Sequence, residues 1–148
     1  MWTRIIQLFR ASEVPRRSYI HPALGTFEFH VGLGWKRNCR VDGHDVEVVI
    51  GSDGEMPSVD MANTVADWAL HWADLRQAVV EYIDRELSTW NQEWHPTVAN
   101  RLVLSSIQVL WPDSPTTTML YFDDPDDDIR SWHVTCEGRE PKVFAFDD

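Results

Sequence analysis

Apolar and polar residues alternate along two segments, residues 35–41 and 44–50, that flank the dipeptide Asp42-Gly43. Alternation with a period of two is typical of a strand with one buried face, and Asp-Gly is favoured in two-residue hairpin turns. Such a turn fixes the register, which here gathers apolar side chains on one face and opposite charges on the other. The predicted pairs are Val41 with His44, Cys39 with Val46, Arg37 with Val48 and Trp35 with Ile50 on the apolar face, and Arg40 with Asp45 and Asn38 with Glu47 on the charged face, with Lys36 diagonal to Glu47.

A further strand is predicted over residues 25–31, before this hairpin, because apolar and polar residues alternate there as well. Its apolar members are Phe27, Phe29 and Val31, which we expect on the buried face. Residues 1–24 are expected to form a peripheral arm, and the segment from residue 15 to residue 22 an irregular connector bounded by prolines.

The pattern changes to spacings of three and four from Met61 to Tyr82, which predicts an amphipathic helix laid on a sheet. A short helix is predicted after His95-Pro96, with the proline in its first turn, ending near Leu102. The apolar side of the long helix holds Met61, Val65, Trp68, Trp72, Leu75, Val79 and Tyr82, and the opposite side holds Asp67, Asp74, Glu81 and Asp84.

Four short strands are predicted after the helices, over residues 104–111, 116–122, 131–136 and 143–146. Their tight connections favour an antiparallel meander. The predicted fold class is therefore α+β, a two-layer sandwich in which one long and one short helix pack on a face of an antiparallel sheet. The length of 148 residues suits a single domain over residues 1–148.

The formal net charge of −11 narrows the classes of partner. Residues 1–24 carry four arginines against one glutamate, whereas residues 113–148 carry ten acidic side chains against three basic ones. An acidic chain repels phosphate backbones, so we expect no nucleic acid partner and favour a basic protein. No apolar run is long enough for a membrane helix, and Arg4 interrupts the only candidate signal core, so we expect a cytoplasmic protein without a membrane partner.

Several short motifs occur in a characteristic order: Gly25-Thr-Phe-Glu-Phe, Trp35 ten residues later, a hairpin ending in Val46-Glu-Val-Val, the long helix, Ser106-Ile-Gln-Val and Tyr121-Phe-Asp-Asp. This order, over residues 25 to about 136, resembles a bacterial domain family of unknown function. The resemblance implies an α+β fold and a bacterial source, and it implies no activity. It also suggests a loose similarity to immunity-type proteins of bacterial toxin systems.

The chain departs from that family at one place. The family often has a Gly-His pair where this chain has Ser131-Trp132, with His133 one position later. The resemblance therefore assigns no role to His133.

Residues 123–128 form the most acidic segment of the chain, with aspartates at Asp123, Asp124, Asp126, Asp127 and Asp128. Carboxylate oxygens suit calcium, but the segment lacks the glycine and the glutamate of an EF-hand loop at their required positions. We therefore assign no metal site. Two interpretations stay open, a solvated connector between strands and an acidic patch that binds a basic partner.

Catalysis by histidine is an alternative interpretation. His71 follows Asp67 by four residues and precedes Asp74 by three, a spacing that permits an acid–base pair on one helix face. A small hydrolase or metal-dependent enzyme would use this set, or His133 with the acidic segment. The chain has no nucleophile elbow and no glycine-rich phosphate loop, so no catalytic residue and no cofactor is assigned.

Trp90 and Trp94 are four residues apart in a segment with few other apolar residues. They are expected just beyond the long helix, either packed against the sheet edge or exposed as anchors of a protein interface. The leading hypothesis is a non-enzymatic binding module, an acidic inhibitor or immunity-type partner of a basic protein, which uses the acidic segment and these tryptophans. A structural homodimer joined through a tryptophan-bearing face is the third hypothesis.

Overall fold

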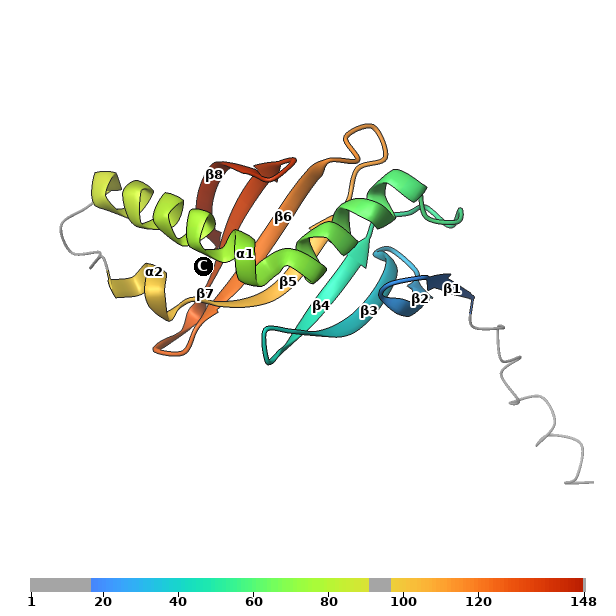
Figure 1. Cartoon of the computed structure of the whole chain (residues 1–148), viewed down its shortest axis with the longest axis horizontal. Coiled ribbons are helices and arrows are strands. Elements are labelled where there is room, and N and C mark those ends of the chain that lie inside the picture. The colour runs from blue at the N-terminus through green and yellow to red at the C-terminus, as the bar shows by residue number, and fades with distance from the viewer. Residues whose placement is uncertain (1–16, 91–96, 148) are drawn as a thin grey trace, which may run out of the picture.

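One sheet and two helices make up the computed structural model, which describes residues 17–90 and 97–147 (Figure 1). The elements in these ranges are β1 (Ser18–His21), β2 (Gly25–His30), β3 (Gly34–Val41), β4 (His44–Ile50), α1 (Val59–Trp90), α2 (Thr97–Arg101), β5 (Val103–Val109), β6 (Thr117–Asp124), β7 (Asp127–Glu137) and β8 (Glu140–Asp147). All eight strands lie in one open sheet in sequence order. Neighbouring strands are antiparallel except β4 and β5, which are parallel because the chain passes through both helices between them.

The predicted hairpin of β3 and β4 is confirmed residue for residue, from Val41 opposite His44 to Trp35 opposite Ile50. On its charged face, Lys36 Nζ lies 2.5 Å from a Glu47 carboxylate oxygen, as the diagonal pairing predicted. Arg37 is the one charged residue on the apolar face. Its guanidinium reaches across to the neighbouring strand β2 and donates to the Thr26 carbonyl at 3.1 Å.

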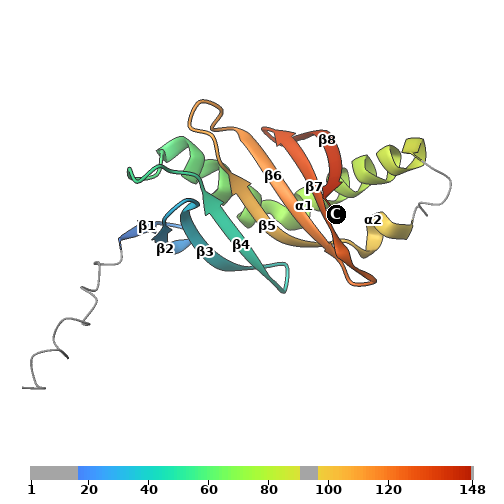
Figure 2. The ribbon, with the colours of Figure 1, turned by 180° about the vertical axis from the view of Figure 1, so that it is seen from behind.

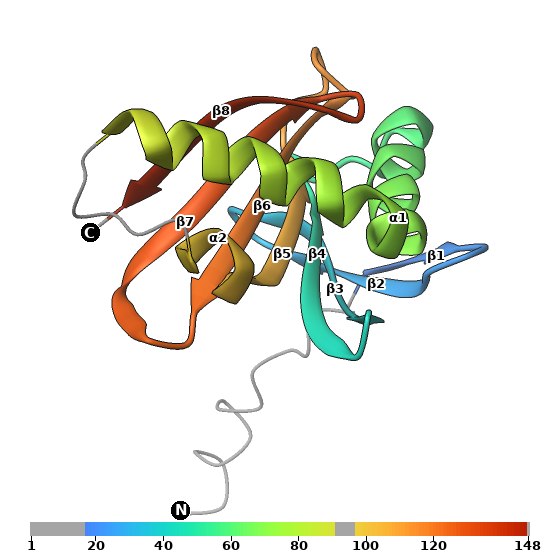
Figure 3. The ribbon, with the colours of Figure 1, turned by 60° about the vertical axis from the view of Figure 1, so that its left-hand side comes forward.

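Helix α1 lies along one side of the sheet, with α2 below it on the same side (Figures 1 and 3). Seen from behind, the strands lie in front of α1, and no helix of the described ranges covers this face (Figure 2). The Ser58 hydroxyl accepts from the Met61 N–H at 3.4 Å and caps the start of α1. The helix ends at Trp90, which was expected just beyond it, and Ile83 and Leu87 continue its buried side past Tyr82. The buried residues of α1 are Met61, Ala62, Val65, Ala66, Trp68, Trp72, Val79, Val80, Tyr82, Ile83 and Leu87.

The expected connector before residue 22 is wrong in part, because Ser18–His21 forms β1 and pairs with β2. The Tyr19 ring lies 6.1 Å from Phe27 and so joins the apolar side of the sheet. A strand of four residues next to a proline gives too few alternating positions for sequence recognition. Val31 is also misplaced by the prediction, since it lies in the turn after β2 and is 94% exposed. The rest of the predicted arm, residues 1–16, lies outside the described residues.

The four late strands are confirmed as the antiparallel meander β5 to β8, and α2 is confirmed as the short helix. The predicted six-residue acidic loop is wrong, because β6 and β7 extend into it and leave only a two-residue turn at Pro125-Asp126. Asp124 pairs with Asp127 across this turn, after a register shift that follows Phe122. The aspartates therefore belong mainly to strand ends.

The α+β class is thus confirmed, as one mostly antiparallel sheet with one long and one short helix. The core joins the apolar side of α1 to one face of the sheet. None of the helices in the described ranges combines the length and the apolar character that crossing a lipid bilayer requires.

Candidate functional site

The acidic segment, residues 123–128, contains the turn between β6 and β7, and we call it the acidic turn from here on. Its central residue is Asp124. The Asp124 side chain is only 3% exposed, and its carboxylate accepts two hydrogen bonds from Arg101, from Nη2 at 2.9 Å and from Nε at 3.3 Å. It also accepts the Asp126 N–H at 3.0 Å, and the Asp126 carboxylate lies 3.2 Å from Arg101 Nε. The Arg101 hydrogen bonds lower the pKa of Asp124, against the opposing effect of burial. One arginine of α2 therefore compensates two of the five aspartates.

A second arginine compensates Asp127. Arg130 Nη1 lies 2.5 Å from the Asp127 carboxylate, which also accepts the Ile129 N–H at 3.1 Å. Hydrogen bonding to the Ile129 amide, followed by that to Arg130, lowers the pKa of Asp127. The two remaining aspartates, Asp123 and Asp128, are exposed on the strands that flank the turn. Two arginines thus neutralise the acidic turn only in part: three of its five aspartates are ion-paired, and Asp123 and Asp128 are exposed without an ion-pair partner in the described ranges.

The catalytic hypothesis rests on His71, which is exposed on α1. His71 Nδ1 lies 3.2 Å from an Asp67 carboxylate oxygen, whereas no hydrogen bond or ion pair joins it to Asp74 in the described part of the chain. The Asp67 carboxylate accepts two hydrogen bonds from Arg139, at 2.6 and 2.8 Å, and these lower the pKa of Asp67. Asp67 therefore mainly binds an arginine of the β7–β8 turn, which favours a structural role for it over that of a partner for a histidine base.

His133 lies on the face of the sheet that α1 does not cover. Its Nε2 is 3.6 Å from the Asp147 carboxylate of β8, and its ring lies 5.5 Å from that of Tyr121. Burial, followed by the nearby charge of Asp147, raises the pKa of Tyr121. The structure thus pairs His133 with β8 rather than with the acidic turn. Among residues 17–90 and 97–147, no three His, Cys, Asp or Glu side chains gather as metal ligands would.

Trp90 is the last residue of α1 and not part of a segment beyond it. Its ring stacks on Phe144 at 5.0 Å and lies 5.8 Å from Phe146, while 37% of the residue stays exposed. Trp90 therefore closes one end of the core against β8 and keeps an accessible edge. Trp94 lies outside the described residues.

The two cysteines of the chain are free thiols on strands. Burial raises the pKa of Cys136 to about 12 and also raises that of Cys39, where Arg37 acts in the opposite direction. Both thiols are therefore protonated at neutral pH and poor nucleophiles.

A set of acidic residues lies on the solvent side of α1, where most of them are exposed. Acidic residues recur there every seven positions, and a helix of 3.6 residues per turn brings such positions back to almost the same side. Leu70 lies among them and is 57% exposed. We call this surface the acidic helix face, and its acidic members are Asp60, Asp67, Asp74, Glu81 and Asp84, with Leu70 between Asp67 and Asp74 and the exposed Arg85 next to Asp84.

The number of ion pairs that the carboxylates form distinguishes this face from the acidic turn. Asp60, Asp74 and Asp84 have no ion-pair partner within the described ranges, and Glu81 accepts one hydrogen bond, from Gln77 at 2.8 Å. Only Asp67 is bound to a cation, Arg139. The spacing of apolar residues in the sequence placed four of these acids opposite the core. It did not show which of them form ion pairs, and it did not identify Leu70 as exposed.

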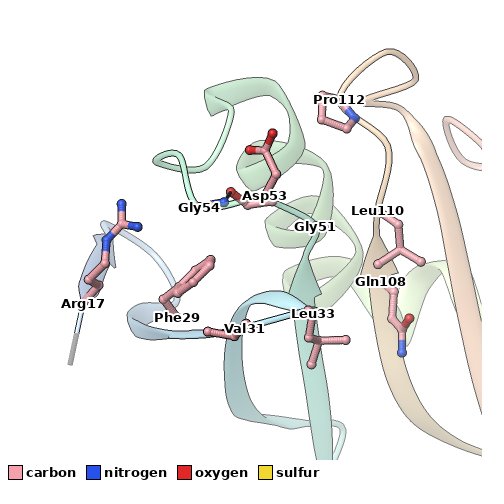
Figure 4. Close-up of a pocket in the computed structure, with 12 residues that line it drawn as sticks. Arg17, Phe29, Val31, Leu33, Gly51, Asp53, Gly54, Gln108, Leu110 and Pro112 are labelled. Atoms are coloured by element: carbon pink, nitrogen blue, oxygen red, sulfur yellow. Dashed lines mark hydrogen bonds between the residues drawn. The ribbon is translucent and has the colours of Figure 1, made fainter. Parts of the chain in front are cut away.

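A groove of about 930 Å³ at one end of the sheet is a site that sequence reasoning missed (Figure 4). Its walls come from β2 and the turn after it, from the segment between β4 and α1, and from the segment after β5. The sequence signal is a turn with apolar residues, Val31-Gly-Leu33-Gly, where polar side chains are usual.

No family model matches the chain, and no curated protein or solved structure matches it, which is consistent with an uncharacterised family. Nothing in these comparisons identifies a relationship to immunity-type proteins.

Proposed function

We propose that this protein is a non-enzymatic binding module that docks a basic protein on the acidic helix face. The observation that carries the proposal is the row of carboxylates along the outer side of α1, of which Asp60, Asp74, Glu81 and Asp84 have no ion-pair partner in the described ranges, with the exposed Leu70 between Asp67 and Asp74. An exposed leucine flanked by carboxylates suits a small interface, in which the apolar side chain excludes water and the charges orient the partner.

The acidic turn supports this role less well than its composition suggested. Arg101 and Arg130 already bind Asp124, Asp126 and Asp127, so a partner's cations would have to displace them. On the helix face, Asp60, Asp74, Glu81 and Asp84 are available without such a cost, and only Asp67 is already bound to a cation, Arg139. A two-layer arrangement, with α1 over one side of the sheet, would leave the outer side of α1 free for a partner.

The net charge of −11 supports the same role through kinetics. A field of one sign steers an oppositely charged protein during diffusion and raises the association rate, and added salt screens this effect. We therefore expect association with small basic proteins to slow steeply as the salt concentration rises.

The test compares two double variants of equal net charge in stopped-flow association with a panel of small basic proteins. Asp74→Lys with Glu81→Lys reverses two charges on the helix face, and Asp123→Lys with Asp128→Lys reverses the two exposed, unpaired charges of the acidic turn. We expect the helix-face variant to associate about tenfold more slowly than the turn variant at low salt, because local charge steers the docked orientation.

Equal slowing in the two variants would show only a general effect of net charge and would contradict docking on α1. Greater slowing in the turn variant would move the partner surface to residues 123–128. Leu70→Ala serves as the non-electrostatic control, and we expect it to raise the dissociation rate while the association rate changes little.

A further inference from the structure

The groove of Figure 4 is held in shape by two glycines where three strand ends converge. A Cβ on Gly34 would lie 2.3 Å from the Ile50 carbonyl oxygen, and one on Gly51 would lie 2.2 Å from that of Leu110. Only glycine permits these approaches of β3 to β4 and of β4 to the end of β5. The Trp35 indole N–H donates to the Glu55 carbonyl at 2.9 Å and fixes the segment between β4 and α1. The groove is therefore largely pre-formed.

Its walls are apolar and accessible. Val31 and Leu33 project from the turn after β2, at 94% and 36% exposure, and Leu110 and Pro112 form the opposite side. Figure 4 shows these two sides facing each other across the end of β4. Apolar side chains left exposed around a concave site are the usual lining of a ligand pocket, and the groove volume lies in the range of small-molecule sites.

One cation is positioned beside these walls. The Arg17 guanidinium lies 5.1 Å from the Phe29 ring centroid and 5.7 Å from that of Trp35. The Arg17 carbonyl accepts the Phe29 N–H at 3.0 Å, which anchors the backbone, and the absent side chain of Gly54 leaves space beside Nη1. In this acidic protein, Arg17 has no carboxylate partner among residues 17–90 and 97–147.

We propose that this groove binds a small apolar carboxylic acid, with its hydrocarbon part between the Val31–Leu33 turn and Leu110 and its carboxylate on Arg17. Rings beneath the guanidinium restrict its motion but leave its N–H donors for an anion. The exposed Asp53 at the rim weakens anion binding by repulsion, so the proposal also predicts tighter binding after Asp53→Asn. The groove is separate from the acidic helix face, so this inference does not depend on the proposed partner.

Isothermal titration with three ten-carbon probes tests the site. The probes are decanoate, decanol and decylamine, which share one hydrocarbon chain and differ in the head group. We expect decanoate to bind about tenfold more tightly than decanol, the gain typical of one charge-assisted hydrogen-bonded contact, and decylamine to bind least. Amide signals of residues 31–34, 51–54 and 108–111 should shift on binding.

The variants separate the roles of charge and apolar surface. Arg17→Gln should abolish the preference for decanoate over decanol while keeping decanol binding, and Leu33→Asp should weaken both. Arg85→Gln is the matched control, because Arg85 also lies over an aromatic ring, 5.6 Å from Tyr82, but outside the groove. It should leave all three affinities unchanged.

Four results would overturn the proposal: no binding of decanoate, equal affinity for the three head groups, a preference for the acid that survives Arg17→Gln, or amide shifts confined to other regions. Peptides also end in a carboxylate, so an acetylated peptide with a C-terminal leucine is a further probe. Tighter binding of that peptide than of decanoate would overturn the assignment to a small molecule.

Discussion

The acidic turn and the acidic helix face carry similar numbers of carboxylates but use them differently. In the turn, Asp124 is buried against Arg101, and its neighbours share the cations of Arg101 and Arg130. On the helix face, Asp60, Asp74 and Asp84 face solvent, without an ion-pair partner in the described part of the chain. The number of acidic residues in a sequence segment therefore does not tell how many of their carboxylates are unpaired and accessible to a partner.

The physical difference lies in where each carboxylate gains its interactions. A buried carboxylate needs partners within the fold, since an uncompensated charge away from water is strongly unfavourable. An exposed carboxylate is solvated by water and keeps its field for encounters with other molecules. The turn should thus matter for stability and the helix face for association.

The largest expected effect is on folding stability. Asp124→Ala should lower the free energy of unfolding by about 2 kcal/mol, because it leaves the Arg101 guanidinium and the Asp126 amide without their buried acceptor. Asp74→Ala should change it by less than about 0.5 kcal/mol, as is usual for exposed substitutions. Urea denaturation followed by circular dichroism measures both, and equal effects would remove the distinction between the two regions.

The elements of the fold that have long, regular patterns were predictable. The Asp42-Gly43 turn and the matching charges of Arg40 and Asp45 determined one register, and the structure has that register. Helix α1 was predictable for the same reason, although Trp90 was expected just beyond the helix and is its last residue. Strand β1 was missed, because four residues carry almost no periodicity and its partners Glu28 and Gly25 are defined only by tertiary pairing.

The candidate sites were less predictable, because pairing is a property of three-dimensional structure. Arg101 is more than twenty positions from Asp124 in sequence, and Arg139 is 72 positions from Asp67. No spacing rule links such residues. The groove depends in the same way on two close backbone approaches, at Gly34 and Gly51, that only the folded sheet reveals.

The stability of the protein at acid pH is a second test of the difference between the acidic turn and the helix face. The hydrogen bonds from Arg101 lower the pKa of Asp124 in the folded state. Its contribution to stability is therefore complete above the unfolded pKa, near 3.9, and is lost as the pH falls through the lower folded pKa. We expect the free energy of unfolding of Asp124→Asn to fall less than that of the wild type between about pH 5 and about pH 2. Parallel curves would show that the fold does not favour the ionised form of Asp124.

A smaller effect on the free energy of unfolding is expected at Asp67, which lies on the helix face but is ion-paired like the acids of the turn. This residue belongs to the helix face but binds Arg139, and both side chains are partly exposed. Arg139→Gln should lower the free energy of unfolding by about 0.5 kcal/mol, since exposed pairs are screened by solvent. Asp67→Asn should have a similar effect, and the double variant should be no worse than either single variant, because both remove the same interaction.

The smallest effect tests whether the helix face is free of internal interactions. Asp74→Asn with Glu81→Gln removes two like charges that lie seven residues apart on α1 and keeps the side-chain shapes. Neither acid forms an ion pair in the described ranges, and the charge of Asp74 only contributes, after Asp67, to raising the pKa of Arg139. The main change is therefore less repulsion within an acidic surface. We expect the free energy of unfolding to rise by about 0.3 kcal/mol in low salt, and the gain to disappear near 1 M salt, where charges are screened within about 3 Å. A loss of stability would show that these carboxylates hold the fold together after all, and it would weaken their assignment to a partner.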